Sequence, residues 1–333
     1  MPQRPTAASL PRGGPAWSDA AAMDAAPDTR PPGAAAPPER ASAGHGRPWQ
    51  STRFLAVVLC VVWAMMFIVQ RLALEVAPAL WVGALRVVVA AIVLLPLAKA
   101  LRGVGRRGLA TIGVLALTNQ VGFIGLQVAG LETVGAGPAA AIVYLQPVLV
   151  VLASGPMGGE RLTRRRLTAV LLGLAGVGVI GLHQAAAASL AGVLFLLAAA
   201  VSWAAGTLIT SASEEPIMRL VVGQHLLGGP MLAGIAALAE PFPPLSAQLV
   251  ACVVFAGACG SALGWTILGT LLRRGDAGTV STWLYAVPVL AAVLGVVILG
   301  ESPSATLVVG IGLVALGVRL VAAPLRRGVA RSR

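Results

Sequence analysis

Residues 136–160, AGPAAAIVYLQPVLVVLASGPMGGE, and residues 277–301, AGTVSTWLYAVPVLAAVLGVVILGE, are two forms of one segment, 141 positions apart. The matching aromatic, proline and acidic positions are Tyr144 with Tyr285, Pro147 with Pro288, and Glu160 with Glu301. Valine and leucine match by chance in any pair of apolar helices, whereas tyrosine, proline and a Gly-Glu pair do so far less often. The chain therefore contains an internal duplication.

The composition of the chain is too apolar for a soluble protein. Of its 333 residues, 57% are hydrophobic and 11% are charged, against about 25% charged residues in a soluble domain. From Phe54 onward, apolar runs of roughly 17–25 residues alternate with short breaks, and that length spans a bilayer. The predicted spans are 54–70, 79–98, 109–129, 136–155, 166–182, 189–210, 217–238, 247–272, 278–298 and 304–323.

The lysines and arginines orient these spans. Only Arg71 lies in an odd-numbered break, whereas thirteen cations lie in the even-numbered breaks and the first residues of the C-terminal tail. They are Lys99, Arg102, Arg106, Arg107, Arg161, Arg164, Arg165, Arg166, Arg219, Arg273, Arg274, Arg326 and Arg327. The positive-inside rule then predicts a multi-pass protein of the plasma (inner) membrane with both termini cytoplasmic. No base-stacking aromatics accompany the clusters, so the net charge of +12 does not predict a nucleic-acid partner.

Composition divides the chain into four parts. Residues 1–50 hold ten of the 23 prolines and no signal-peptide core, and are expected to be a disordered Pro/Ala-rich cytoplasmic tail. Residues 54–183 form the first five-helix repeat and residues 189–323 the second. Residues 324–333 form a basic cytoplasmic tail.

The two repeats are expected to be inverted. Trp63-Ala64 recurs as Trp203-Ala204, and Val82-Gly83 as Val222-Gly223, both 140 positions on. Because each half has five spans, an odd number, the second half enters from the opposite side. The predicted fold is thus all-α integral membrane, with ten transmembrane helices as two inverted five-helix repeats. That architecture is typical of carriers with a site between the halves, although channels and duplications kept for packing are alternatives.

The ten helices resemble a known family. The fourth and ninth are rich in Ala and Gly, carry a central proline and end in Gly-Glu. The first and sixth each hold a tryptophan, and the second has an early arginine (Arg86). The eighth contains the segment Gly260 to Trp265 and leads to Arg273-Arg274-Gly275-Asp276. These features, over about residues 54–323, resemble the EamA-like family of the drug/metabolite transporter superfamily. The resemblance implies transport of small metabolites such as amino acids and leaves the substrate open.

Two ionisable residues, Arg86 and His225, lie well inside predicted spans rather than near their ends. Arg86 lies about eight residues into the second span, where an unpaired charge is costly. It is a candidate anchor for a substrate carboxylate, or else an arginine that caps carbonyls or extends toward the membrane surface. His225, at nearly the same depth in the seventh span, is a candidate proton site, although a neutral, hydrogen-bonded histidine is the favoured interpretation.

Polar and aromatic residues complete the candidate cavity. Asn119, Gln120 and Gln146 either bind substrate or join helices, and Trp63 and Trp283 lie inside spans rather than at interfaces. Tyr144 and Tyr285 lie near the midpoints of paired spans. Pro147 and Pro288 follow three residues later and either permit gating or form static bends.

Several expectations rest on what the sequence lacks. No Asp or Glu falls near the middle of a predicted span, so transport is either facilitated or coupled through His225 or the substrate's own protonation. The cysteines show no metal-ligand spacing, and we expect no metal and no cofactor.

Together these features predict a secondary transporter rather than an enzyme. It would export a small metabolite, such as an amino acid or a drug-like compound, by alternating access. Membrane lipid is an expected partner, and Gly260-x-x-x-Gly264 permits a homodimer, although packing within one chain is favoured. An intramembrane enzyme such as a lipid-modifying transferase and a non-transporting membrane subunit are the alternatives.

Overall fold

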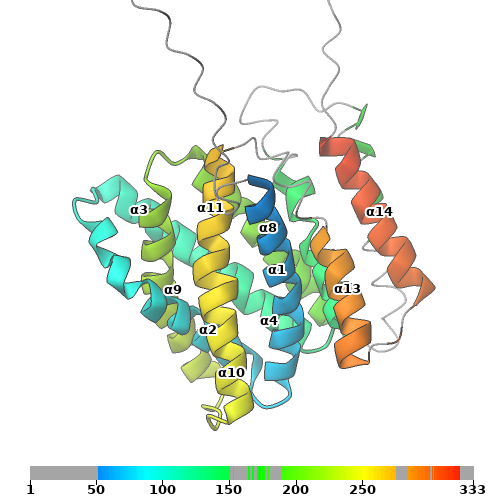
Figure 1. The fold of residues 1–333 in the computed structure, drawn as a ribbon, viewed down its shortest axis with the longest axis horizontal. Helices are drawn as coiled ribbons and strands as arrows, with labels where there is room; N and C mark the ends of the chain where they lie inside the picture. Colours follow the sequence, from blue (N-terminus) through cyan, green and yellow to red (C-terminus); the bar gives the residue numbers. More distant parts are fainter. Residues whose placement is uncertain are drawn as a thin grey trace, which may run out of the picture. The chain divides into compact units, whose positions relative to one another are not determined.

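The computed structural model describes residues 52–150, 189–274, 286–300 and 304–322, with isolated residues between 153 and 179, Leu284 and Ser302. Every regular element in these residues is a helix (Figure 1). The elements of the first half are α1 (Thr52–Leu74), α2 (Ala79–Leu94), the 3₁₀ helix η2 (Leu95–Leu101), α3 (Arg106–Leu115), the π-helix η3 (Ala116–Gly125), α4 (Leu126–Leu131) and α5 (Ala136–Val143). Those of the second half are α8 (Leu190–Ala212), α9 (Ile217–Ala239), α10 (Ala247–Phe255), the π-helix η4 (Ala256–Leu263), α11 (Gly264–Arg274), α13 (Ala286–Leu299) and α14 (Ala305–Ala322).

Six of these helical stretches are long and apolar enough to cross a membrane. They are Thr52–Leu74, Ala79–Leu101, Arg106–Leu131, Leu190–Ala212, Ile217–Ala239 and Ala247–Arg274. They coincide with the predicted first, second, third, sixth, seventh and eighth spans. The chain is therefore a multi-pass helical membrane protein. Shorter apolar helices occupy the predicted fourth, ninth and tenth spans, and most of the predicted fifth span, 166–182, lies outside the described residues.

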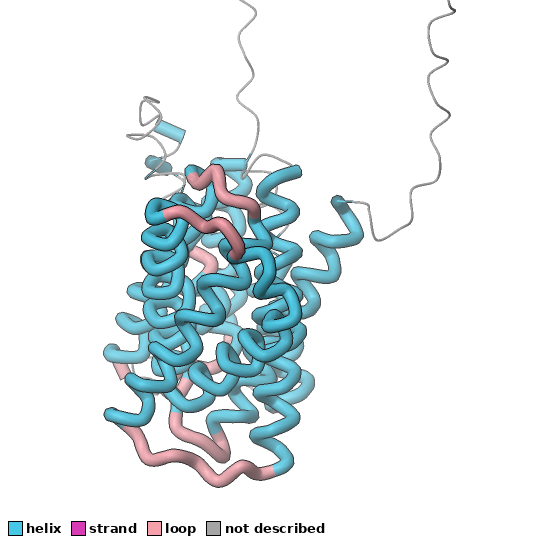
Figure 2. Tube along the Cα trace, turned by 90° about the vertical axis from the view of Figure 1, so that its left-hand side faces the viewer, coloured by secondary structure: helices cyan, strands magenta, loops and turns pink. Residues whose placement is uncertain are grey.

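The helices of the two halves pack in matched pairs. α2 and α9 run antiparallel, because Gly83 contacts Leu232 at one level and Gly229 contacts Val87 further along. α5 packs on α13, where a Cβ on Gly137 would lie 3.0 Å from the Cα of Ala292. Contacts of α2 with η4 are mirrored by those of α9 with η3, and contacts of α1 with α13 by those of α8 with α5. The connecting loops gather at the two ends of these helices (Figure 2).

Two π-helical segments interrupt the long helices of the predicted third and eighth spans. η3 begins at Ala116 and η4 at Ala256, and these positions are 140 residues apart, the same offset that relates the two sequence repeats. The apolar pattern of residues 109–129 and 247–272 did not indicate either segment. π-Helical turns are frequent at functional sites, and these two supply Asn119, Gln120 and Ser261 to the core.

Arg71, the one arginine of the odd-numbered breaks, has a structural role. Its Nη1 donates to the carbonyl oxygens of Leu131 and Glu132, at 2.9 and 2.7 Å. These carbonyls end α4, where the last turn of a helix leaves acceptors without intrahelical partners. A cation there also interacts favourably with the helix dipole.

At the N-terminus of α2, a carboxylate from a distant helix replaces the missing cap. Residue Pro78 precedes α2 and supplies no side-chain acceptor. Instead, Oε2 of Glu240 accepts hydrogen bonds from the backbone nitrogens of Leu80 at 2.9 Å and Trp81 at 3.3 Å. The indole nitrogen of Trp81 donates back to the Glu240 carbonyl at 3.1 Å. The carboxylate thus joins the end of α9 to the start of α2.

Glu240→Ala is expected to lower the free energy of unfolding by about 1 kcal/mol, the usual cost of losing an N-terminal cap. Thermal unfolding of the purified protein in detergent measures the change. Glu214→Ala is the matched control, because Glu214 is exposed and accepts no hydrogen bond from the described residues. Equal destabilisation by the two substitutions would contradict the capping role.

Candidate functional site

Arg86 is a buried cation in the middle of the helix bundle. It is 3% exposed and is the only charged residue of α2. Its Nε donates to Oγ of Ser261 at 2.8 Å, and its Nη1 donates to Oε1 of Gln70 at 2.5 Å and to Oε1 of Gln127 at 3.3 Å. These partners come from η4, α1 and α4, so the guanidinium joins three other elements to α2.

The charge of Arg86 is not neutralised within the described residues. Its three hydrogen-bond acceptors are a hydroxyl and two amide oxygens, all uncharged. A guanidinium stays protonated in proteins, and a buried charge without a counter-ion is costly. Nε2 of Gln70, beside the guanidinium, is a buried donor that has no partner among the described residues. The surroundings of Arg86 therefore favour an anion that accepts hydrogen bonds.

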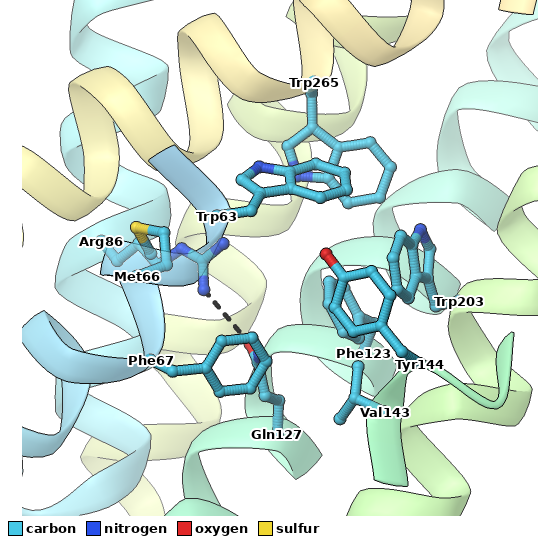
Figure 3. Close-up of a pocket in the computed structure, with 10 residues that line it drawn as sticks. All are labelled: Trp63, Met66, Phe67, Arg86, Phe123, Gln127, Val143, Tyr144, Trp203 and Trp265. Carbon is cyan, nitrogen blue, oxygen red and sulfur yellow. Dashed lines mark hydrogen bonds between the residues drawn. The ribbon is translucent and has the colours of Figure 1, made fainter. Parts of the chain in front are cut away.

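Aromatic rings face Arg86 across a small cavity (Figure 3). The ring of Trp203 stacks on Phe123 with centroids 4.9 Å apart, and meets Tyr144 edge-on at 5.4 Å. Trp63 contacts Trp203 edge-on at 5.5 Å, and Trp265 at 6.2 Å. Arg86 lies on one side of the cavity and the Trp203 group on the other, with the Tyr144 hydroxyl directed into the space between them. A ligand there would meet one cationic wall and one aromatic wall.

The cavity is closed to its surroundings. Its empty volume, which counts every gap between the lining atoms, is about 310 Å³. The lining residues are Trp63, Met66, Phe67, Arg86, Phe123, Gln127, Val143, Tyr144, Trp203 and Trp265. Each of them is less than 9% exposed. They come from the predicted first, second, third, fourth, sixth and eighth spans, so most of the bundle converges on this point.

A second cavity adjoins the first across Trp265. Its empty volume is about 320 Å³. It is lined by Thr207, Thr210, Ile217, Leu220, Val221, Gln224, Trp265, Leu268, Gly269 and Leu272. Trp265 lines both cavities, and its indole nitrogen is buried without a partner among the described residues. This ring therefore stands between two separate spaces in the bundle.

A second polar group lies between η3 and α9. Nδ2 of Asn119 donates to Oε1 of Gln224 at 2.8 Å, and the side chain of Gln120 lies against Gly228. Nδ1 of His225 lies 2.7 Å from the carbonyl oxygen of Val221. Among the described residues, Oδ1 of Asn119, both polar atoms of the Gln120 side chain and Nε2 of His225 have no partner. Such atoms are normally satisfied by water or a ligand.

The structure brings together some of the predicted site residues. Trp63, Arg86 and Tyr144 line the central cavity. Asn119, Gln120 and His225 are buried in the separate polar group, and Nε2 of Gln146 donates to Oγ1 of Thr207 at 2.9 Å. Trp283 and Tyr285 lie outside the described residues.

The two prolines lie in different settings. α5 ends at Val143, Tyr144 and Leu145 form a turn, and the chain is helical again from Gln146. Pro147 has no N–H to donate to the Val143 carbonyl, which explains the break at this point. Pro288 lies in α13, and Leu284, four residues before it, is also helical. Gating by either proline stays a prediction.

Several residues of the site were not predicted. Gln70 was missed because the first span was predicted to end at residue 70, whereas α1 continues to Leu74 and buries Gln70 completely. A polar residue at a span end gives no signal, but the same residue inside a span does. Phe123 and Ser261 are ordinary residues of apolar helices, and only their tertiary contacts distinguish them. Gly260 and Gly264 face α1 of the same chain, where an added Cβ would meet Met66 and Trp63 respectively.

The fold and site together define a class: a multi-pass helical membrane protein with a closed, largely aromatic internal cavity that contains a buried cation. Known proteins agree with this class. The sequence profile of the EamA-like transporter family matches residues 50–182 and again residues 190–323. The chain belongs to the EamA-like transporter family.

Three relatives illustrate the family. An uncharacterized transporter, YvbV, from Bacillus subtilis is 30% identical over 82% of this chain and 92% of its own length. A probable terminal-alkyne amino-acid exporter from Streptantibioticus cattleyicolor is 29% identical over 80% of this chain and 92% of its own. A probable amino-acid metabolite efflux pump from Salmonella typhimurium is 26% identical over the same shares of the two chains. The relatives are thus named as transporters, two of them of amino acids or their metabolites.

Proposed function

We propose that the protein is a secondary transporter that exports a small amphipathic carboxylate, an amino acid or a related compound, across the plasma membrane. The observation that carries this proposal is Arg86, a buried cation that faces an aromatic wall across a closed cavity and has only uncharged partners among the described residues. A carboxylate would pair with the guanidinium, and an apolar or aromatic side chain would contact the rings. The names of two relatives, both exporters of amino-acid compounds, support the substrate class and the direction.

The packing of equivalent elements supports alternating access between two inverted halves. Trp63 and Trp203, which correspond in the repeats, meet edge-on at the central cavity. α2 and α9 also correspond, and they run antiparallel, as a two-fold axis in the membrane plane requires. The second cavity beyond Trp265 supplies the next part of a path, and rotation of that ring would join the two spaces.

The remaining architectural features complete the proposal. The ten helices comprise a first repeat over residues 54–183 and a second over residues 189–323, with cytoplasmic tails at 1–50 and 324–333. The arginine distribution supports cytoplasmic termini. A homodimer is compatible with this arrangement and would use surfaces other than Gly260 and Gly264, which face α1.

The cavity favours a transporter over the two alternatives. An enzyme would need an acid–base pair or metal ligands at membrane depth. The buried polar residues of the described core are Gln70, Arg86, Asn119, Gln120, Gln127, Gln146, Thr207, Gln224, His225 and Ser261, a set suited to hydrogen bonding rather than proton transfer between paired groups. A non-transporting subunit would be expected to have a fully packed centre instead of a cavity that includes Arg86.

Counterflow in proteoliposomes tests the proposed function. Vesicles are loaded with an unlabelled amino-acid mixture and exposed to the same mixture carrying a radiolabel. A carrier is expected to accumulate label transiently, whereas a channel equilibrates without an overshoot and a subunit or enzyme transports nothing. Lack of any overshoot with amino acids and with the amphipathic carboxylates excreted by cells that overexpress the protein would refute the proposal.

His225 is expected to be the proton-sensitive group if transport responds to a pH gradient. It is the only histidine in a predicted span, and Nε2 is available because Nδ1 contacts the Val221 carbonyl. His225→Gln should then abolish the response to a pH jump imposed on proteoliposomes while leaving counterflow intact. Glu75→Gln, at a helix end, is the control. Proton-driven uptake that survives the His225 substitution and disappears only with a carboxylate substitution would overturn this assignment.

A further inference from the structure

An apolar groove lies on the exposed surface of the helix bundle, away from the central cavity. It is formed by the connection from η2 to α3 and by the facing side of α9. Its lining residues are Leu101, Val104, Leu109, Ile112, Gly223, Leu226 and Leu227, all of them apolar or glycine. Its empty volume, including the part open to the outside, is about 530 Å³, the largest of the spaces described here. Leu109 is 58% exposed and Leu227 41% exposed, so the groove opens outward.

Gly223 on α9 allows α3 to pack closely at one end of the groove. A Cβ on Gly223 would lie 2.7 Å from side-chain carbons of Ile112, which is closer than side chains pack. α3 and α9 therefore approach closely at Gly223 and Ile112. Leu226 and Leu227 continue the wall beyond this contact. The groove is a built feature of the interface between two helices.

Four cations are interleaved with the groove residues along the chain. Lys99, Arg102, Arg106 and Arg107 are all exposed, and their side chains donate to no group among the described residues. Arg219 also extends into this region, but its guanidinium already has partners within the chain. It pairs with Glu215 at 2.6 Å and donates to the carbonyl oxygens of Ala100 and Arg102.

Glu215 is a carboxylate beside this cluster. Its side chain pairs with Arg219 and lies against Gly108, in the first turn of α3. Five cations outnumber Glu215 and its chain neighbour Glu214, so the region carries a net positive charge. The four exposed cations are therefore available to bind anions from outside the chain.

We propose that this groove and its cations form a binding site for an anionic glycerophospholipid. An acyl chain would lie along Leu109, Ile112 and Leu227, and the phosphate would meet Arg102, Arg106 and Arg107. The combination of cations and an apolar groove favours an anionic lipid. A soluble anion has no acyl chain to fill the groove, and a zwitterionic lipid carries no net negative charge to pair with the arginines. Each lysine or arginine near a membrane surface contributes about 1 kcal/mol to attraction of anionic lipid. The inference is independent of what the central cavity transports.

Native mass spectrometry of the full-length protein tests the site, with titration by phosphatidylglycerol and, separately, phosphatidylcholine. The wild-type protein is expected to retain phosphatidylglycerol with at least about tenfold preference, given three phosphate-facing arginines. The triple variant R102Q/R106Q/R107Q should lose that preference. The control variant R53Q/R164Q/R319Q removes the same number of charges from exposed arginines that do not line the groove. It should retain the preference for phosphatidylglycerol.

A groove-filling variant keeps the test informative if the triple variant fails to fold. Leu227→Trp changes no charge and should reduce retention of phosphatidylglycerol, because the indole occupies the space of an acyl chain. Inorganic phosphate should not displace the lipid, which distinguishes a lipid site from a phosphate site. Equal retention of both lipids by the wild-type protein, equal losses in the two triple variants, displacement by phosphate, or unchanged retention in Leu227→Trp would each overturn the proposal.

Discussion

Arg86→Gln is expected to reduce transport of a carboxylate substrate by on the order of 100-fold. The substitution removes the only positive charge that lines the central cavity among the described residues, and a hydrogen-bonded ion pair at a closed site contributes about 3 kcal/mol. The loss should affect carboxylates and spare their neutral amide analogues, because the amide gains less from the charge. Initial rates of uptake or counterflow in proteoliposomes give the measurement.

Protein stability separates this effect from misfolding. Removing a buried charge that lacks a counter-ion relieves a desolvation cost. This gain offsets the loss of the hydrogen bonds to Gln70, Gln127 and Ser261, so Arg86→Gln should unfold close to the temperature of the wild-type protein. Arg71→Gln is the matched control: it removes the hydrogen bonds to the Leu131 and Glu132 carbonyls and should lower stability while sparing transport per folded molecule. Arg86→Lys should transport more than Arg86→Gln, since it keeps the charge but loses the fork of donors. Equal loss of carboxylate and amide transport in Arg86→Gln would argue against charge recognition.

Trp203→Ala is expected to cost about 3–5 kcal/mol of unfolding free energy, the range for deleting a large buried aromatic side chain. The ring is 1% exposed and contacts Trp63, Phe123 and Tyr144. Its loss would leave the other rings of the cavity without their common partner, so transport should fall as well. Unfolding monitored by tryptophan fluorescence or circular dichroism in detergent measures the stability change.

Two further variants bracket the effect of Trp203. Trp203→Phe preserves the stack on Phe123 and should cost about half as much, because less volume is removed. Phe242→Ala removes a ring that is 57% exposed and contacts Trp81 at the end of the bundle, and it should cost less than 1 kcal/mol on the scale of surface substitutions. If Trp203→Ala were no more destabilising than Phe242→Ala, the aromatic cluster would not be an organising feature of the core.

The sequence predicted the helical membrane fold because long apolar runs are a strong local signal. Six predicted spans recur as helices with ends displaced by a few residues. The need of Arg86 for polar partners was also predictable, since a charge inside an apolar run is costly in any direction. Its neutral partners Gln70 and Ser261 were not, because they belong to other helices, and only the packing of α1 and η4 against α2 brings them to the guanidinium.

The shape of the cavity depended on long-range packing that no local pattern encodes. Trp203 was noted as a tryptophan inside a span and as the repeat equivalent of Trp63, but it was not among the predicted cavity residues. The structure places it at the centre of the aromatic cluster. The π-helical segments η3 and η4 have the same apolar composition as an α-helix, so their altered hydrogen bonding left no trace in hydropathy. Asn119 and Gln120 were grouped with the cavity because they share its depth, but they face α9 instead.

The most direct test of carriage through the Arg86 cavity is untargeted metabolite profiling of the growth medium. Cells that overexpress the wild-type protein are compared with cells that express Arg86→Gln at the same level. The wild-type medium is expected to be enriched in one or a few small carboxylates that carry an apolar or aromatic group, and this enrichment should be absent with Arg86→Gln. Identical metabolite profiles for the two proteins, or enrichment of compounds that lack a carboxylate, would contradict the account.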